Sequence, residues 1–176
     1  MTINFPSKVR AAGKNNWTYV PAIAIPSAPT IAELNAGIMT QASYDADQMR
    51  PSGSSDTQAE QRYMQEFESQ GRGRKKFEFA DVEVIFDPQT PDSVDYELAT
   101  AWIAEPDGYM VARLGVAHDA AFAAAQVLSV IVPVSIVDLL PVAPDPSKPN
   151  DAYRRLFQIL TTGDPITDVT IAGSGS

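Results

Sequence analysis

Hydrophobic and polar residues alternate with a period of two along much of the chain, as in strands that bury one face. This alternation runs through residues 17–25, 77–86, 109–116, 126–137, 153–162 and 166–172, and a shorter apolar run occupies 38–43. Clusters of glycine, proline and aspartate separate these segments and supply the turns between them. The pattern therefore predicts a mainly β protein of about seven strands.

Three of the predicted strands carry further information. Pro21 has no backbone N–H to donate, so the strand at 17–25 should lie at a sheet edge or contain a bulge there. Between 77 and 86 the apolar phase moves from odd to even positions near Ala80 and Asp81, which indicates a β-bulge. The even positions of the strand at 126–137 form an unbroken apolar face that should be core: Leu128, Val130, Val132, Val134 and Ile136.

Helical patterns are few. Between 92 and 105, apolar residues recur on one helical face behind a capping residue, which predicts a helix that packs on a sheet. Thr30 and Glu33 form a capping box for a short helix, which Gly37 should end in a left-handed conformation. Residues 57–69 could form another short helix.

A polar stretch at 44–76 interrupts the strand pattern. It holds proline, glycine, a cluster of serines and many glutamine and glutamate residues, and no core-forming period survives in it. Long polar excursions from a compact domain are generally functional or disordered. We therefore expect an arm that leaves the body of the protein.

Length and composition fit a single domain that spans residues 1–176. The chain is 44% hydrophobic, and no apolar run reaches the ~20 residues that a membrane-spanning helix needs. Its start lacks the pattern of a secretory signal, and it has no cysteine. The expected fold is a β-sandwich or partial barrel of about seven strands, with one flanking α-helix, a long loop arm and a mobile tail at 173–176.

Composition leaves little material for catalysis. Without cysteine and with the single histidine His118, the chain lacks a thiol nucleophile and a multi-histidine metal site. Carboxylates near the predicted helix do not fall at positions that would set two of them across a cleft. These carboxylates are Asp92, Asp95, Glu97, Glu105 and Asp107. We therefore expect that the protein is not an enzyme and that it has no catalytic residue, metal or cofactor.

Charge is divided unevenly along the chain. Residues 1–76 carry 9 basic and 7 acidic side chains, whereas residues 77–176 carry 4 basic and 15 acidic ones, for a net charge of −9. An acidic surface disfavours binding to phosphates and suits a wall that must not retain DNA. The alternative is an ordinary solvated acidic surface.

Basic and aromatic residues supply the candidates for contacts between copies. The Gly-Arg-Gly-Arg-Lys-Lys run at 71–76 lacks the spacing of a phosphate-binding loop. It is either an exposed loop end or, as we prefer, a partner for the acidic half of a neighbouring copy. Tryptophan is enriched at protein interfaces. The interface candidates are Arg50, Arg62, Arg72, Arg74, Lys75, Lys76, Trp17 and Trp102.

Four segments point to a known family when they are taken in order. Residues 29–37 read PTIAELNAG, and residues 96–104 read YELATAWIA, followed by GYMV at 108–111. VIVPV at 130–134 and FQIL at 157–160 lie in the last two long strands. In this order they resemble the tail tube (major tail) proteins of long, non-contractile, siphovirus-type bacteriophage tails, above all those of phages that infect actinobacteria. The resemblance covers residues 17–172 and departs from the family at 44–76 and 141–150.

The resemblance implies a structural virion protein. Six copies would form a ring, rings would stack into the tail tube, and each copy would lend a sheet to a continuous barrel around the DNA channel. The segment 44–76 would be an arm between subunits. Ser129, Ser135 and Gln158 would face the channel.

The resemblance also implies partners and a location. The partners would be other copies of the chain, the tape-measure protein, the tail terminator or tip proteins, and genomic DNA that passes without specific binding. The protein would be made in the host cytoplasm and end in the phage tail, with no membrane span.

Other functions remain open at this point. One is another ring-forming tail part, such as a tail terminator, or the tube of a secretion machine. A monomeric β-sandwich binding module would need a concave aromatic patch. An enzyme would need a cleft with carboxylates around His118 or 92–107.

Overall fold

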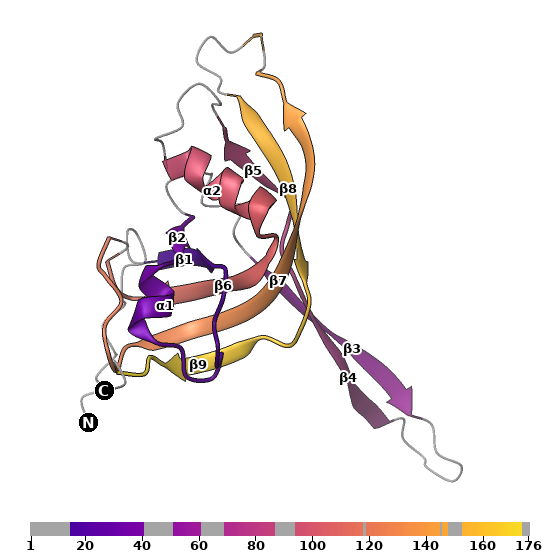
Figure 1. Ribbon diagram of the computed structural model, residues 1–176. Helices are drawn as coiled ribbons and strands as arrows, with labels where there is room; N and C mark the ends of the chain where they lie inside the picture. The colour runs from indigo at the N-terminus through magenta and orange to yellow at the C-terminus, as the bar shows by residue number, and fades with distance from the viewer. Residues whose placement is uncertain are drawn as a thin grey trace, which may run out of the picture.

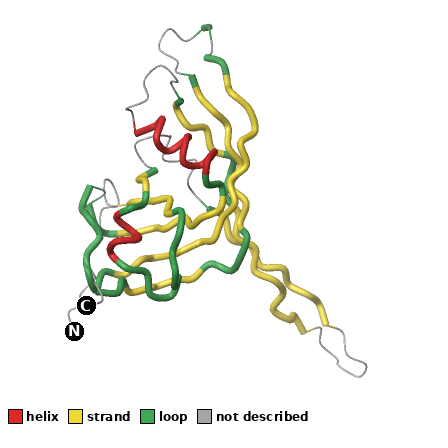
Figure 2. The backbone as a smooth tube through the Cα atoms, viewed as in Figure 1, coloured by secondary structure: helices red, strands yellow, loops and turns green. Residues whose placement is uncertain are grey.

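The computed structural model describes residues 15–40, 51–60, 69–86, 94–117, 119–144, 146–147 and 153–173. Its elements are β1 (Asn15–Val20), α1 (Ile31–Asn35), β2 (Ile38–Met39), β3 (Ser52–Glu60), β4 (Ser69–Glu78), β5 (Val82–Ile85), α2 (Val94–Ala104), β6 (Asp107–Leu114), β7 (Val127–Val142), β8 (Arg154–Thr161) and β9 (Ile166–Thr170). The mainly β class with few helices is confirmed (Figures 1 and 2).

One curled sheet forms the body. Six strands follow the order β2-β1-β6-β7-β8-β5, and β9 pairs with β7 beside that path. β7 pairs with β6 from Val130 to Ser135 on one side. On its other side it pairs with β9 at its start and with β8 from Val134 onward. The 16 residues of β7 thus connect the β1–β6 side of the sheet with the β8–β5 side.

The sheet buries apolar side chains on both of its faces. On one face, α2 packs over a cluster that includes Tyr19, Trp102, Met110 and Phe157, all buried. The opposite face is covered near α1 by a second cluster that contains Leu34. Neighbouring residues of β6, Met110 and Val111, point into different clusters, as alternation along a strand requires. Helix α2 confirms the helix predicted at 92–105 for its described residues.

Helix α1 begins as its capping box predicts. The Thr30 hydroxyl accepts a hydrogen bond from the Glu33 N–H, and the Glu33 carboxylate accepts from the Thr30 N–H at 2.8 Å. The Ala24 N–H donates to the same carboxylate, also at 2.8 Å. These donors lower the pKa of Glu33. The box therefore ties the preceding loop to the helix as well as capping it.

The predicted role of Gly37 was wrong. Among the described residues, positive φ values occur at Gly115, Ala125 and Asp168, so Gly37 does not end α1 in a left-handed conformation. A Cβ atom added at Gly37 would instead lie 2.8 Å from the backbone oxygen of Tyr19. Gly37 is therefore required because the chain after α1 passes very close to β1.

A second glycine makes room for a buried aromatic ring. A Cβ atom at Gly108 would lie 2.7 Å from the Tyr19 hydroxyl oxygen. That hydroxyl donates to the backbone carbonyl of Glu105, just after α2. The Tyr19 ring meets the Trp102 ring edge-to-face at 6.1 Å, so the start of β6, the end of α2 and β1 interlock.

Arg113 organises the loop between β6 and β7. It is fully buried, and its guanidinium donates to the carbonyl oxygens of Ala117, Ala120 and Ala121. Its carbon Cζ lies 4.5 Å from the Phe122 ring centroid. Burial lowers the pKa of Arg113, and the carbonyl acceptors compensate part of the lost hydration.

Several predicted boundaries need correction. β1 ends at Val20 and lies between β2 and β6, so Pro21 marks the end of an inner strand rather than an edge or bulge. The segment 77–86 is split into β4 and β5, so the phase change near Ala80 is a break between two strands. Residues 57–60 belong to β3, which contradicts the suggested helix at 57–69.

The count and length of strands also differ from the prediction. β7 extends beyond the strand end predicted at residue 137, through Pro141 to Val142, because a register shift near Leu139 lets it keep pairing with β8. The arm adds two strands, so the described residues contain nine. Residues 41–43 of the strand predicted at 38–43 and residues 174–176 of the tail lie outside the described residues.

Replacement of Gly37 tests whether close approach or backbone conformation requires glycine. We expect Gly37→Ala to lower the free energy of unfolding by about 1–3 kcal/mol, because backbone and side chains must move away from the new Cβ. Gly37→Asn should cost at least as much, although asparagine tolerates left-handed conformations. Urea unfolding measures both, with Gly173→Ala as the control because its Cβ would contact nothing within 4 Å. Native stability in Gly37→Asn would contradict the close-approach explanation.

Tyr19 should make the fold sensitive to alkali. Burial, helped by the charges of Glu105 and Asp107, raises the pKa of Tyr19 to about 12 from its ordinary value of 10.0. The folded state thus favours the neutral phenol, so this stabilisation is present below pH 10 and is lost as the pH rises towards 12.

Urea unfolding at a series of pH values from 8 to 11.5 checks the Tyr19 effect. In Tyr19→Phe, we expect lower stability at pH 8 by about 1 kcal/mol, from the lost hydrogen bond, and a shallower decline above pH 10. Tyr153→Phe is the control, because Tyr153 is exposed. An equally steep decline in Tyr19→Phe would exclude Tyr19 as the source.

Candidate assembly surfaces

A two-stranded hairpin projects from the body. β3 and β4 pair from Ser52 with Glu78 out to Glu60 with Ser69, with an irregularity between Ser55 and Thr57. No third strand pairs with this hairpin among the described residues, and Figure 1 shows it pointing away from the sheet. An isolated two-stranded hairpin is at best marginally stable in water. We call β3–β4 the arm, and both of its outer edges are open to further pairing.

The arm carries most of the basic interface candidates. Arg72, Arg74, Lys75 and Lys76 all belong to β4. Arg50 and Arg62 lie outside the described residues. The structure therefore collects four predicted cations on one strand of the arm, within a span without any acidic residue.

The two tryptophan candidates lie in different environments. Trp102 is only 1% exposed and packs at 5.1 Å, edge-to-face, on Phe157, so the chain itself already covers it. Trp17 is half-buried and meets Phe79 edge-to-face at 5.5 Å, and Phe79 in turn meets Phe77. Trp17 thus anchors the root of the arm to the body.

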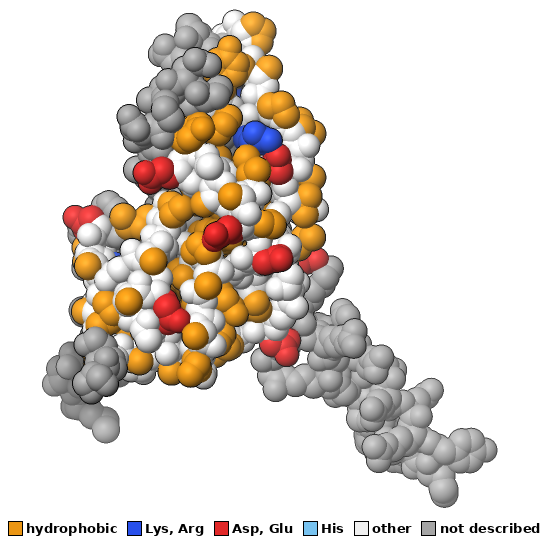
Figure 3. Space-filling view, in the orientation of Figure 1, with side chains coloured by type: hydrophobic (Ala, Val, Ile, Leu, Met, Phe, Trp, Pro, Cys, Tyr) orange, Lys and Arg blue, Asp and Glu red, His pale blue; other side chains and the backbone are white. Residues whose placement is uncertain are grey.

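One part of the sheet keeps an uncovered apolar face. Cross-strand registers place Val82, Phe157 and their neighbours towards α2, so the intervening residues point the opposite way. The uncovered face, as we call it, includes Ile85 (39% exposed), Val137 (38%), Leu140 (52%) and Leu160 (44%). Figure 3 shows hydrophobic side chains along the margin of the body where β7 lies. Four exposed large hydrophobic side chains on one face of a sheet mark a candidate interaction site.

The basic residues that the structure describes in the body are already engaged. Arg154 forms an ion pair with Glu83 at 2.5 Å, and Arg155 holds Asp138 with two hydrogen bonds that raise the pKa of Arg155. Arg113 is buried in its loop. Within the described part of the body, every lysine or arginine thus already has a carboxylate or carbonyl partner.

The channel candidates do not lie together. Ser135 pairs with Leu160 and Gln158 with Val137, so both are half-buried within the uncovered face. Ser129 is half-buried near the β7–β9 pairing, where the register skips it. Their assignment to the channel stays a prediction, and the apolar surroundings of Ser135 and Gln158 favour a contact between copies instead.

Three of the carboxylates considered for catalysis have side chains that the structure describes. Glu97, Glu105 and Asp107 are exposed, while Asp92 and His118 lie outside the described residues. Asp107 lines a cleft of about 550 Å³ with Tyr109 and Pro133. Among the described residues, no group of three or more histidine, cysteine or acidic side chains could hold a metal ion. No helix in the described part of the chain has the length and apolar character to span a membrane.

Comparison with known families shows which kind of protein carries these surfaces. A family model described as phage tail tube protein matches residues 2–174 of the chain. The chain belongs to the phage tail tube protein family. The sequence resemblance to tail tube proteins is thereby confirmed. No curated protein matches the chain.

Family membership indicates the general role of these surfaces, which is assembly. Tail tube proteins are structural components of a phage virion, and the family implies self-assembly into a tube. Sequence reasoning missed the uncovered face, because Pro141 hid the extension of β7 and strand registers cannot be read from one sequence. Val137 and Leu140, two large hydrophobic residues that are exposed in the structure, were the sequence feature that could have indicated this face.

Lysine substitutions on the uncovered face should separate folding from assembly of this tail tube protein. We expect Val137→Lys/Leu140→Lys to change the free energy of unfolding by less than about 0.5 kcal/mol per site, because both side chains are exposed. Self-association should be lost, because two charges would be buried without partners. Sedimentation velocity measures association, with Ile25→Lys on the loop after β1 as the control. Normal assembly of the double variant would instead place this face on the channel wall.

Proposed function

We propose that six copies of the chain form a ring, that rings stack into the tail tube, and that the enclosed channel conducts genomic DNA into the host. The observation that carries this proposal is a curled, open sheet in a chain whose family self-assembles into a tube. The path of the sheet ends at β2 and β5, and each has an unpaired outer edge within the described residues. Closure of sheets across copies would satisfy such edges.

The charge distribution supports a channel that does not retain DNA. The net charge is −9, and the described cations of the second half are held by Glu83, Asp138 or backbone carbonyls. Binding to DNA phosphates depends on available lysine and arginine side chains. An acidic wall would repel the phosphates and let DNA slide.

The arm would connect neighbouring subunits. In this proposal the segment 44–76, with its cations on β4, reaches a neighbouring copy and meets acidic surface there. Further partners are the tape-measure protein inside the tube and the terminator or tip proteins at its ends. The protein would be made in the host cytoplasm, and the tail would be of the non-contractile, siphovirus type.

Negative-stain electron microscopy of the purified protein tests the proposal. Across a range of protein and salt concentrations, we expect hollow tubes or stacked rings of uniform diameter, with sixfold symmetry in end-on class averages. Single rings that never extend would instead favour a tail terminator. A strictly monomeric protein at every concentration would contradict the proposal.

A further inference from the structure

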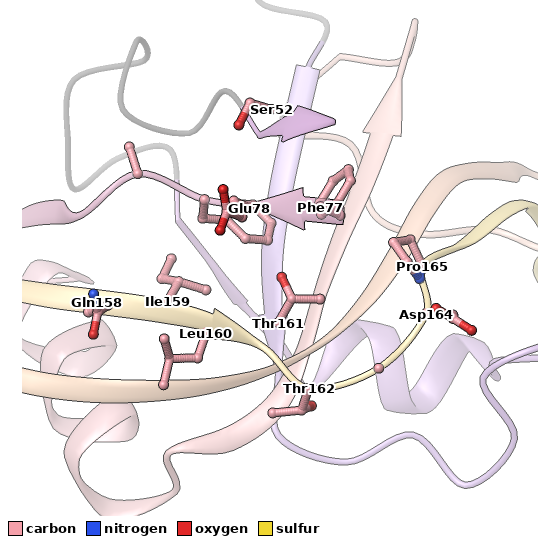
Figure 4. Close-up of a pocket in the computed structure, with 13 residues that line it drawn as sticks. Ser52, Phe77, Glu78, Gln158, Ile159, Leu160, Thr161, Thr162, Asp164 and Pro165 are labelled. Carbon is pink, nitrogen blue, oxygen red and sulfur yellow. The ribbon is translucent and has the colours of Figure 1, made fainter. Parts of the chain in front are cut away.

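A cleft separates the root of the arm from the end of β8. Its volume is about 830 Å³. One wall consists of Ser52 and the segment 77–80, and the other consists of the segment 158–165 (Figure 4). The cleft therefore lies between the arm and the body sheet, where no strand fills the space among the described residues.

The β8 side of this cleft is an unpaired strand edge. β5 pairs with β8 only from Arg154 to Phe157, so the outer edge beyond Phe157 has no paired strand among the described residues. The Thr162 N–H donates to the Pro133 carbonyl of β7, so even-numbered residues here bond to β7. The alternation of an antiparallel ladder then directs the backbone groups of Ile159 and Thr161 to the open edge.

A buried polar group accompanies the open edge. The hydroxyl of Thr161 is buried and has no hydrogen-bond partner within the described part of the chain. A buried hydroxyl without a partner is unfavourable, so the structure gains stability if a further group reaches it. The edge and the hydroxyl together indicate a place for an additional strand.

The charge of the cleft restricts the partner. Glu78 and Asp164 line it and are exposed, and none of its thirteen lining residues is basic. The span 69–76 of β4 has four basic residues and no acidic one. The arm of the same copy cannot fill the cleft, because it starts at the cleft wall and runs away from it.

We propose that this cleft receives β4 from the arm of a second copy, which adds to the open edge of β8 as an extra strand. The inference rests on the proposed function and names the subunit contact that the arm makes. Backbone hydrogen bonds to an exposed sheet edge are a recurrent mode of recognition. The added strand would also give the arm the third strand that it lacks.

The contact is directional. The arm of one copy enters the cleft of the next, whose own arm stays free to enter a third. Such head-to-tail contacts close into rings or extend into helical filaments, whereas self-complementary contacts stop at a dimer. The proposed contact therefore propagates assembly instead of ending it.

Disulfide cross-linking tests the contact directly, because the chain has no cysteine of its own. Copies with Asp164→Cys are mixed with size-tagged copies with Arg72→Cys, Arg74→Cys or Lys76→Cys before assembly. Each copy has one thiol, so a disulfide between a tagged and an untagged copy is intermolecular. We expect oxidation of assembled tubes to give such mixed dimers for at least one arm position.

A matched control uses Ala123→Cys, on an exposed part of the loop between β6 and β7, in place of Asp164→Cys. Mixed dimers that are no more abundant with Asp164→Cys than with Ala123→Cys, in tubes that form normally, would overturn the inference and leave the proposed function intact. Failure of the unsubstituted protein to form rings or tubes would overturn the proposed function and this inference with it.

Charge reversal supplies a second test. We expect Asp164→Lys to raise the critical concentration for assembly about three- to fivefold, because an exposed charge pair contributes only modestly to association. Lys75→Glu/Lys76→Glu should raise it by the same factor. The combined variant should assemble within about twofold of the unsubstituted protein. Penalties that simply multiply in the combined variant would show that these residues do not meet.

Discussion

The backbone ladder along β7 is the constraint on which the body depends. This strand is the only one of the described sheet that pairs with three others, β6, β8 and β9. Its apolar residues enter both core clusters, with Val132 towards α2 and Ile131 towards the opposite face. A register slip of one residue would exchange these two faces, so both clusters fix the same register. The positions of α2, the arm root and the uncovered face all follow from that register.

Local chemistry in the sequence was a good guide to local structure. The capping box of Thr30 and Glu33 and the helical period of the residues in α2 were interpreted correctly, because both depend only on residues close together in the sequence. Gly37 could not be interpreted in this way, because its requirement comes from β1, a strand far from it in the sequence. Pro141 misled for a related reason, since a break in register lets a proline remain in a strand.

The candidate surfaces were predictable to a smaller extent. The cations of β4 were visible in the sequence as a cluster, and the arm was visible as a segment without a core period. Pairing of that segment into a hairpin was hidden, because the sequences of the two strands, SGSSDTQAE and SQGRGRKKFE, do not alternate hydrophobic and polar residues. The open edge of β8 was also hidden, since it depends on where β5 stops.

The sheet and the arm place different demands on the folding chain. The arm is a hairpin between neighbouring segments, whereas the body joins distant ones, as when Trp17 pairs with Ala112. Local pairs form sooner than distant pairs, because they close shorter loops. An arm that forms early would still be only marginally stable by itself. In the proposed contact it would become fixed only on a copy whose β8 edge is already folded, which gives growth of the polymer a preferred order in time.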